Sequence, residues 1–204
     1  MMIRFLPAVA TAALLAGCAS TPAPPSPIEV TRFHDGSMLA AARGTVFVES
    51  APGARLAERD SAPYEAAVAG QLGRLGYVEN SRTNAALVAQ VTVERYRLDS
   101  DGDRRGPVSV GMGGSTGSYG SGFGVGVGIN LGGGKSRERI GTDLAVMLRD
   151  KDTGRAVWEG RAQFSVGVEG DLADPTKQAD VIAEALFRNF PGGNGETVQI
   201  EVNE

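Results

Sequence analysis

The stretch that decides the fold is Arg139–Val166, which reads RIGTDLAVMLRDKDTGRAVWEGRAQFSV. Its two arms alternate between apolar and polar residues and flank Lys151–Arg155, KDTGR. Alternation with a period of two indicates a strand, and Gly154 can take the positive φ that a tight turn requires. The stretch therefore predicts an antiparallel β-hairpin.

Working outward from this hairpin, three more segments are predicted strands. Residues 45–50 read TVFVES, and residues 197–202 read TVQIEV. The longest is 85–98, which reads AALVAQVTVERYRL. Its alternation places an apolar set on one side of the sheet and a polar set on the other. The apolar set is Leu87, Ala89, Val91 and Val93, and the polar set is Gln90, Thr92 and Glu94.

Two segments carry the spacing of helices. For the first, Ser61 is the expected N-cap, Pro63 lies in the first turn and Gly76 is the stop. The second begins at Asp174, with Pro175 at the first helical position, and is expected to end at 191–193. The apolar stripes are Tyr64, Val68, Leu72 and Leu75 in the first helix and Ile182, Leu186 and Phe190 in the second. We expect an α+β fold, a two-layer sandwich with both helices on one face of a mainly antiparallel sheet.

The N-terminus indicates export. Arg4 precedes an apolar run over 5–16 that is shorter than the roughly 20 residues of a membrane-spanning helix, as in a cleaved signal peptide. The run closes on LAGC, ending at Cys18, which resembles the lipobox of bacterial lipoproteins and implies lipidation of this cysteine. Ala19, in place of the aspartate that retains lipoproteins at the inner membrane, favours the outer membrane facing the periplasm.

These features predict the organisation of the chain. Residues 1–17 are the expected signal peptide, 18–27 a proline-rich tether, and 28–204 a single periplasmic domain. Cys18 is the sole cysteine, so no disulfide is expected. Loss of the one charge in 1–17, Arg4, changes the formal charge from −4 to −5, and a chain without a basic stripe is not expected to bind nucleic acid.

A glycine-rich insertion occupies 107–136, and half of the residues from 111 to 134 are glycine. Apolar residues alternate with small ones there: Phe123, Val125, Val127, Ile129 and Leu131. Three interpretations stay open. The segment is a solvated insertion, or a hairpin whose bare face lets another backbone approach, or a membrane-inserting hairpin. The last requires a ring of subunits, because a lone hairpin leaves unpaired backbone groups in lipid.

Three motifs that suggest catalysis or metal binding fail on spacing or context. Lys135-Ser136 follows glycine, but the first glycine of a phosphate-binding loop would fall on Ile129, and a strand rather than a helix follows. Residues 99–103, DSDGD, lack the glycine and glutamate that complete a calcium loop. His34 is the single histidine, and no GxSxG elbow accompanies it. We therefore expect no catalytic residues, no cofactor and no metal.

The sequence also resembles a known family. The lipobox, a helix ending in LGY, the strand ALVAQVTV, the run TGRAVWEGRA over 153–162 and Phe190-Pro191 are similar to a family of envelope lipoproteins described as domain of unknown function 4136. The resemblance implies the fold and the location. It implies no activity.

The expected function is that of a non-enzymatic outer-membrane lipoprotein with a periplasmic binding or assembly module. The candidate interaction surface comprises Phe123, Val125, Val127, Ile129 and Leu131, together with Trp158, which fits either a core position or a platform for a glycan or peptide. The expected partners are the membrane, through the lipid on Cys18, and an envelope protein or the cell wall. The alternative is an oligomeric lipoprotein that inserts glycine-rich hairpins into the outer membrane as part of a pore or secretion assembly. An envelope hydrolase built on His34 is the third interpretation.

Overall fold

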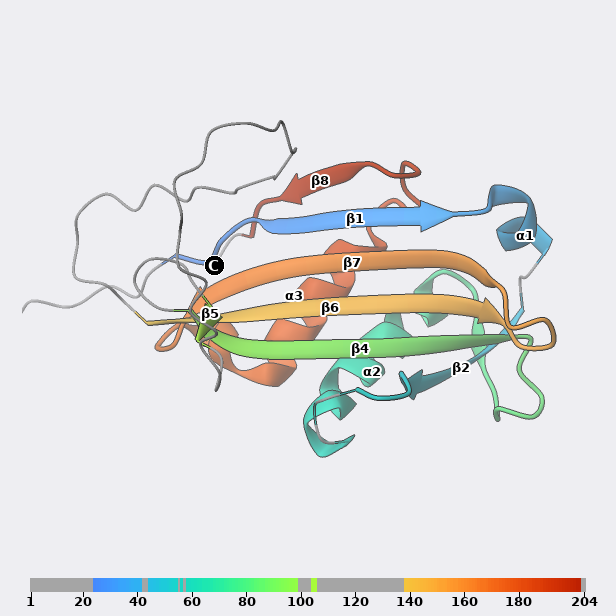
Figure 1. Ribbon diagram of the computed structural model, residues 1–204, viewed down its shortest axis with the longest axis horizontal. Helices are drawn as coiled ribbons and strands as arrows, with labels where there is room; N and C mark the ends of the chain where they lie inside the picture. The colour runs from blue at the N-terminus through green and yellow to red at the C-terminus, as the bar shows by residue number, and fades with distance from the viewer. Residues whose placement is uncertain are drawn as a thin grey trace, which may run out of the picture.

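The computed structural model describes residues 24–41, 44–54, 56, 58–98, 104–105 and 138–202. The elements in chain order are β1 (Ile28–His34), α1 (Gly36–Ala41), β2 (Thr45–Ser50), α2 (Glu58–Arg74), β3 (Val78–Glu79), β4 (Leu87–Leu98), β5 (Arg104–Arg105), β6 (Arg139–Asp150), β7 (Ala156–Gly167), the 3-10 turn η1 (Asp171–Ala173), α3 (Pro175–Phe187) and β8 (Thr197–Ile200). Figure 1 shows these elements around one twisted sheet.

The strands form one mixed sheet in the order β3-β2-β4-β6-β7-β1-β8, with β5 paired only to β4. The α+β class is confirmed. The expectation of a mainly antiparallel sheet is met only in part: the sheet is mixed, because β2 runs parallel to both β3 and β4. The cause is the connection through α2, since a helix that crosses over between two strands returns the chain in the same direction. The remaining pairings, β1 with β7 and β8, β6 with β4 and β7, and β5 with β4, are antiparallel.

The predicted hairpin is present as β6 and β7. Gly154 has a φ of 68°, and the Asp150 carboxylate accepts hydrogen bonds from the backbone N–H and the hydroxyl of Thr153 at 2.8 and 2.7 Å. The ladder shifts register beyond Leu148 and Trp158, where Arg149 pairs with Ala156. The strand of 85–98 is confirmed as β4, and its expected apolar side is fully buried.

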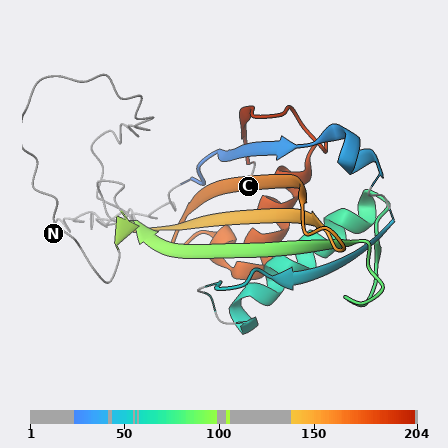
Figure 2. The same ribbon diagram turned by 45° about the vertical axis from the view of Figure 1, so that its right-hand side comes forward.

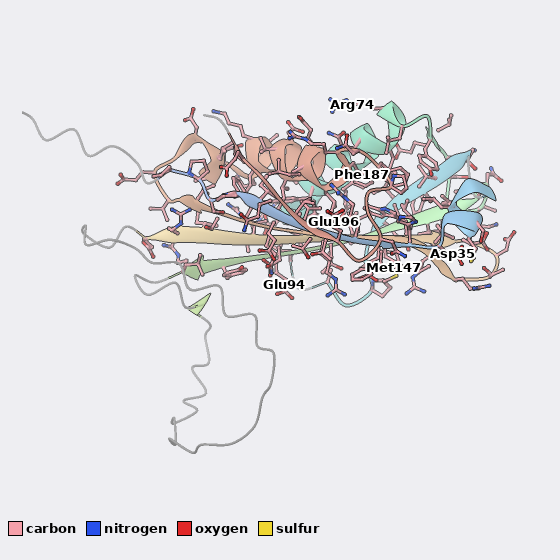
Figure 3. The ribbon with its side chains drawn as sticks, turned by 90° about the horizontal axis from the view of Figure 1, so that it is seen from above. Asp35, Arg74, Glu94, Met147, Phe187 and Glu196 are labelled. Atoms are coloured by element: carbon pink, nitrogen blue, oxygen red, sulfur yellow. The ribbon has the colours of Figure 1, made fainter. Side chains whose placement is uncertain are left out.

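Both long helices cover the same face of the sheet. Figure 2 shows α2 and α3 together behind the strands. Figure 3, an edge-on view, places them on one side, whereas Glu94 and Met147 project from the other. The main core lies between the helices and the sheet. Its largest fully buried apolar side chains are Trp158, Tyr64, Ile28, Leu72, Leu87, Leu144, Leu148, Ile182 and Leu186.

The helix ends differ in part from the expectation. Asp174 is the N-cap of α3, as predicted, and accepts from the N–H groups of Thr176 and Lys177. Ser61, however, lies inside α2, where its hydroxyl donates to the Glu65 carboxylate at 2.8 Å. Helix α2 therefore begins earlier, at Glu58. Leu75 lies beyond the last helical residue and is 39% exposed, so it does not belong to the apolar stripe.

Candidate functional site

The face of the sheet opposite the helices is open and polar. It holds a shallow hollow of about 820 Å³ whose floor is formed by β1, β7, β6 and β4. Residues that pair across adjacent strands line up in rows, so their side chains lie side by side on this face. The first row is Glu29, Gln163, Asp143 and Glu94; the second is Thr31, Arg161, Ala145 and Thr92; the third is Phe33, Glu159, Met147 and Gln90. Alternation along each strand thus gives one apolar and one polar face.

Hydrogen bonds fix several side chains on this face. The Tyr96 hydroxyl donates to the Asp143 carboxylate at 2.9 Å, and the Arg161 guanidinium donates to the Glu159 carboxylate at 2.7 Å. Phe33 is a large apolar side chain there and is 49% exposed. The face therefore combines an aromatic group with planar amide, carboxylate and guanidinium groups, which can hydrogen-bond a polar ligand or a protein surface.

An ion pair continues this face at its β2 margin. The Arg82 guanidinium donates to both carboxylate oxygens of Glu49, at 2.9 and 3.2 Å. This hydrogen bond holds the pKa of Glu49 below its ordinary value, against the opposing effect of burial. Bidentate pairing orients both side chains, so the margin is a fixed negative and positive pair rather than two free charges.

Trp158, an expected surface candidate, points to the other face. It is 1% exposed and stacks on Phe187 with ring centroids 5.1 Å apart. Its indole N–H donates to the Pro191 carbonyl at 3.1 Å. This geometry agrees with the core interpretation, and the indole presents no exposed ring for a glycan or peptide in this structure.

Arg32 is a buried cation on the helix side that the sequence patterns did not single out. Its guanidinium donates to the carbonyls of Ala185 and Leu186 at 2.9 and 2.8 Å. These are carbonyls of the last turn of α3, where helix geometry leaves acceptors unpaired and the dipole favours a cation. Desolvation lowers the pKa of Arg32, whereas Glu196 acts in the opposite direction. Arg32 therefore holds the end of α3 against β1.

His34 is the last residue of β1 and lies beside Gly192, in the segment that follows α3. Its Nε2 lies 3.2 Å from the Gly192 carbonyl oxygen and so carries a proton to donate. Its Nδ1 is buried, and no hydrogen-bond partner for it is found among the described residues. No hydroxyl in the described part of the chain is hydrogen-bonded to this ring, so the structure places no nucleophile against it.

The residues that precede β1 are fastened to one end of the sheet. The Ser26 N–H donates to the Ser165 carbonyl at 2.8 Å, and the Ser165 N–H donates to the Ser26 hydroxyl at 2.9 Å. Arg139 donates to the Pro24 carbonyl at 3.0 Å and to the Ser165 carbonyl at 2.7 Å. Burial lowers the pKa of Arg139. We call Pro24, Ser26, Arg139 and Ser165 the tether clamp.

Several sequence-based candidates lie outside the described residues. They are Cys18, the apolar residues Phe123, Val125, Val127, Ile129 and Leu131, and the motifs at 99–103 and 135–136. Within the described ranges, no group of three or more His, Cys, Asp or Glu side chains could hold a metal ion. No described helix is both long and apolar enough to cross a bilayer.

Comparisons with individual known proteins give matches that are short or low in identity. The chain is 35% identical over 63 residues to the uncharacterized protein ZMO1243 of Zymomonas mobilis, which covers 31% of this chain and only 24% of that protein. Among solved structures, a PelC dodecamer from Paraburkholderia phytofirmans matches at 14% identity and a TM-score of 0.46, over 78% of this chain and 94% of that one. A PDZ domain protein from Parabacteroides distasonis matches at 14% identity and a TM-score of 0.49, over 86% and 38%.

A family model settles the relationship over most of the domain. The match covers residues 45–192, from β2 through α2, the long strands and α3 to the turn that packs on Trp158. This range exceeds half of the chain and includes the hairpin, the Phe190-Pro191 pair and most of the open face. The chain therefore belongs to the DUF4136 family, whose description is a domain of unknown function.

Proposed function

We propose that the protein is a non-enzymatic lipoprotein of the outer membrane, anchored through lipid on Cys18, whose two-layer α+β domain is a periplasmic binding or assembly module. The observation that carries the proposal is the open polar face of the sheet. The helices bury the other face, whereas this one presents a hollow of about 820 Å³ with Phe33 exposed at its rim. Concave surfaces with a few ordered polar groups are the usual places where proteins bind partners.

The anchor is tested by mass spectrometry of the protein extracted from membranes. A diacyl or triacyl mass on an N-terminal Cys18 peptide is expected. The Cys18→Ser variant should then leave the membrane fraction. An unmodified cysteine in a protein that stays in the membrane would overturn the anchor.

The binding face is tested by photo-crosslinking in intact cells. A photoreactive amino acid at Met147, in the centre of the face, should give discrete adducts. The matched control is Ala66, which is exposed on α2 on the opposite side of the domain. Adding Ala145→Arg beside Met147 should reduce the adducts by blocking the hollow. Equal adducts from both positions would contradict a role for this face.

A second function, the oligomeric assembly with membrane-inserting hairpins, is favoured by the position of the glycine-rich insertion. The connection 106–137 leaves after β5 and returns at β6, and Leu98, Arg139 and Gly167 are neighbours across that end of the sheet. The tether clamp holds the N-terminal segment to the same end. The segment to be inserted and the lipid anchor would thus start from one place.

Deletion of 111–134 tests this second function. Detergent-resistant oligomers in the full-length protein that disappear in the deletion variant would support it. A monomer in both, with the Met147 adducts unchanged, would leave the binding module as the function. Since the deletion removes no described strand or helix, circular dichroism of the variant should match that of the parent.

A further inference from the structure

The tether clamp holds residues that lie before the first strand. Pairing of β1 with β7 is recorded from Glu29 onward, whereas the clamp fastens residues 24–26, which lie before the strand. Arg139 donates four hydrogen bonds in the clamp. Three go to Ser165, at 2.7 to 3.3 Å, and one goes to the Pro24 carbonyl at 3.0 Å. The hold thus extends beyond what the sheet itself requires.

The tether clamp buries a cation, the guanidinium of Arg139. In the described part of the chain, the half-buried Arg139 guanidinium bonds only to carbonyl and hydroxyl oxygens, and no carboxylate is paired with it. Burying a cation without a counter-ion carries a desolvation penalty, which the bonds to Ser165 and Pro24 offset only in part. The hydrogen bonds to Pro24 and Ser26 fix the direction in which the chain leaves the domain.

The length of the segment before the clamp limits how far the domain can stand from its anchor. Pro24 follows Cys18 by six residues. At about 3.3–3.6 Å per extended residue, the α-carbon of Cys18 can lie no more than about 22 Å from that of Pro24. A twelve-residue strand such as β6 is about 40 Å long. One end of the sheet is therefore held near the anchor, whereas the Lys151–Arg155 turn lies a strand length away (Figure 1).

We infer that the end of the sheet formed by Leu98, Arg139 and Gly167 faces the lipid headgroups of the membrane, held in that orientation by the tether clamp. This inference rests on the proposed lipidation of Cys18. It adds the surface that meets the bilayer and the residues that set the orientation. The β6–β7 turn then points away from the bilayer, and the open face stands roughly perpendicular to it, free to meet a partner from the side.

The experiment uses the full-length protein from membranes, reconstituted in vesicles of phosphatidylethanolamine and phosphatidylglycerol with a headgroup-attached quencher. Because Cys18 is the sole cysteine and its sulfur is blocked by the lipid, an introduced cysteine can be labelled alone. Glu169→Cys places a fluorophore in the exposed turn after β7, at the clamped end, and Asp152→Cys places one in the exposed β6–β7 turn. Quenching is expected to be severalfold stronger at 169 than at 152.

Clamp variants then test the cause. Arg139→Gln should bring the quenching at 169 and 152 toward one another, because the released domain rotates about a longer tether. Ser26→Pro is the second variant: it removes the Ser26 N–H and hydroxyl and lies outside every strand, so it remains informative if Arg139→Gln fails to fold. The control Arg97→Ala removes an arginine at the same end, paired with Glu138, and should preserve the difference.

The outcomes are distinguishable. An acylated Cys18 with equal quenching at 169 and 152 would overturn the orientation and leave the anchor intact. An acylated Cys18 with a difference that survives both clamp variants would show that another contact sets the orientation, and would overturn the role of the clamp. A Cys18 without an acyl mass would overturn the proposed function, and the orientation with it.

Discussion

The two faces of the sheet are built from the same strands and have opposite properties. On the helix side, Leu144, Val146 and Leu148 of β6 are at most 1% exposed. On the open side, their neighbours Asp143, Ala145 and Met147 are partly exposed and line the hollow. The period of two in the sequence thus separates residues that determine stability from residues available for binding.

The same residue type therefore has a different expected role on each face. Arg32 and Arg161 lie on adjacent strands, yet one is buried against α3 and the other forms a pair with Glu159 in solvent. Gly160 and Gly141 differ likewise: Trp158 fills the space beside the first and Tyr96 covers the second. Matched substitutions on the two faces can test this division.

The largest effect is expected for Trp158→Ala, compared with Met147→Ala. Trp158 stacks on Phe187 and hydrogen-bonds Pro191, so truncation leaves a large cavity under α3. The free energy of unfolding should fall by about 3–5 kcal/mol. Met147 lies on the open face, where truncation should cost less than about 1 kcal/mol. Urea denaturation followed by circular dichroism measures both, and equal losses would refute the division between the faces.

The next effect compares Arg32→Met with Arg161→Met. Loss of the Arg32 guanidinium removes a buried donor from the carbonyls of Ala185 and Leu186, of which Ala185 keeps the bond from the Arg188 N–H. Hydrogen bonds to charged groups contribute about 1.5–3 kcal/mol each, part of which is regained by no longer burying a charge, so we expect a net loss of about 2 kcal/mol. Loss of the exposed Arg161–Glu159 pair should cost less than about 1 kcal/mol.

Hydrogen exchange locates the effect of Arg32→Met. Exchange should accelerate in the last turn of α3, including Phe187, before it accelerates in β4. Uniform acceleration across the domain, or a loss for Arg161→Met as large as that for Arg32→Met, would show that Arg32 does not act through the end of α3.

Local patterns predicted the parts of the fold that depend on near neighbours. The β6–β7 hairpin needs only the alternation of its arms and Gly154, and the start of α3 needs only Asp174 and Pro175. The parallel pairing of β2 with β4 was missed, although the order of strand, helix and strand around α2 contains the signal. β1 was missed because Arg32 lies on its buried side and Phe33 on its open side, which breaks the alternation that Ile28 begins.

The candidate site was predictable only in part. The polar side of β4, with Gln90, Thr92 and Glu94, was predicted from alternation and lines the hollow. The tether clamp was not, because Arg139 and Pro24 are 115 residues apart in the sequence, and such a contact leaves no local pattern. For Trp158, alternation placed the residue on a strand, and only the packing of α3 showed which face is covered.

An effect comparable to that of Arg32→Met is expected when a methyl group is added at Gly160, and a smaller one when it is added at Gly141. At Gly160, a Cβ would overlap the Trp158 ring and lie 2.8 Å from Leu186 Cδ1, and both neighbours are confined in the core. Gly160→Ala should therefore cost about 2–3 kcal/mol. At Gly141, a Cβ would overlap the ring of Tyr96, which is half-buried and can rotate toward solvent. Gly141→Ala should cost about 1 kcal/mol. The reverse order in urea denaturation would show that the open face is the more tightly packed.

The smallest effect is a pH dependence at the margin of the open face. The pKa of Glu49 is lowered in the folded protein, chiefly by the Arg82 hydrogen bond, from its ordinary value of 4.5. The stabilisation is therefore present above pH 4.5, where the unfolded glutamate is also ionised, and is lost as the pH falls through the lowered value. For a pair this exposed the contribution is below about 1 kcal/mol. Glu49→Gln and Arg82→Gln should each remove the same part of the stability decrease between neutral and acidic pH, measured by urea denaturation. If only Glu49→Gln does so, the lowered pKa has a source other than Arg82, and this margin of the face is not held by the ion pair.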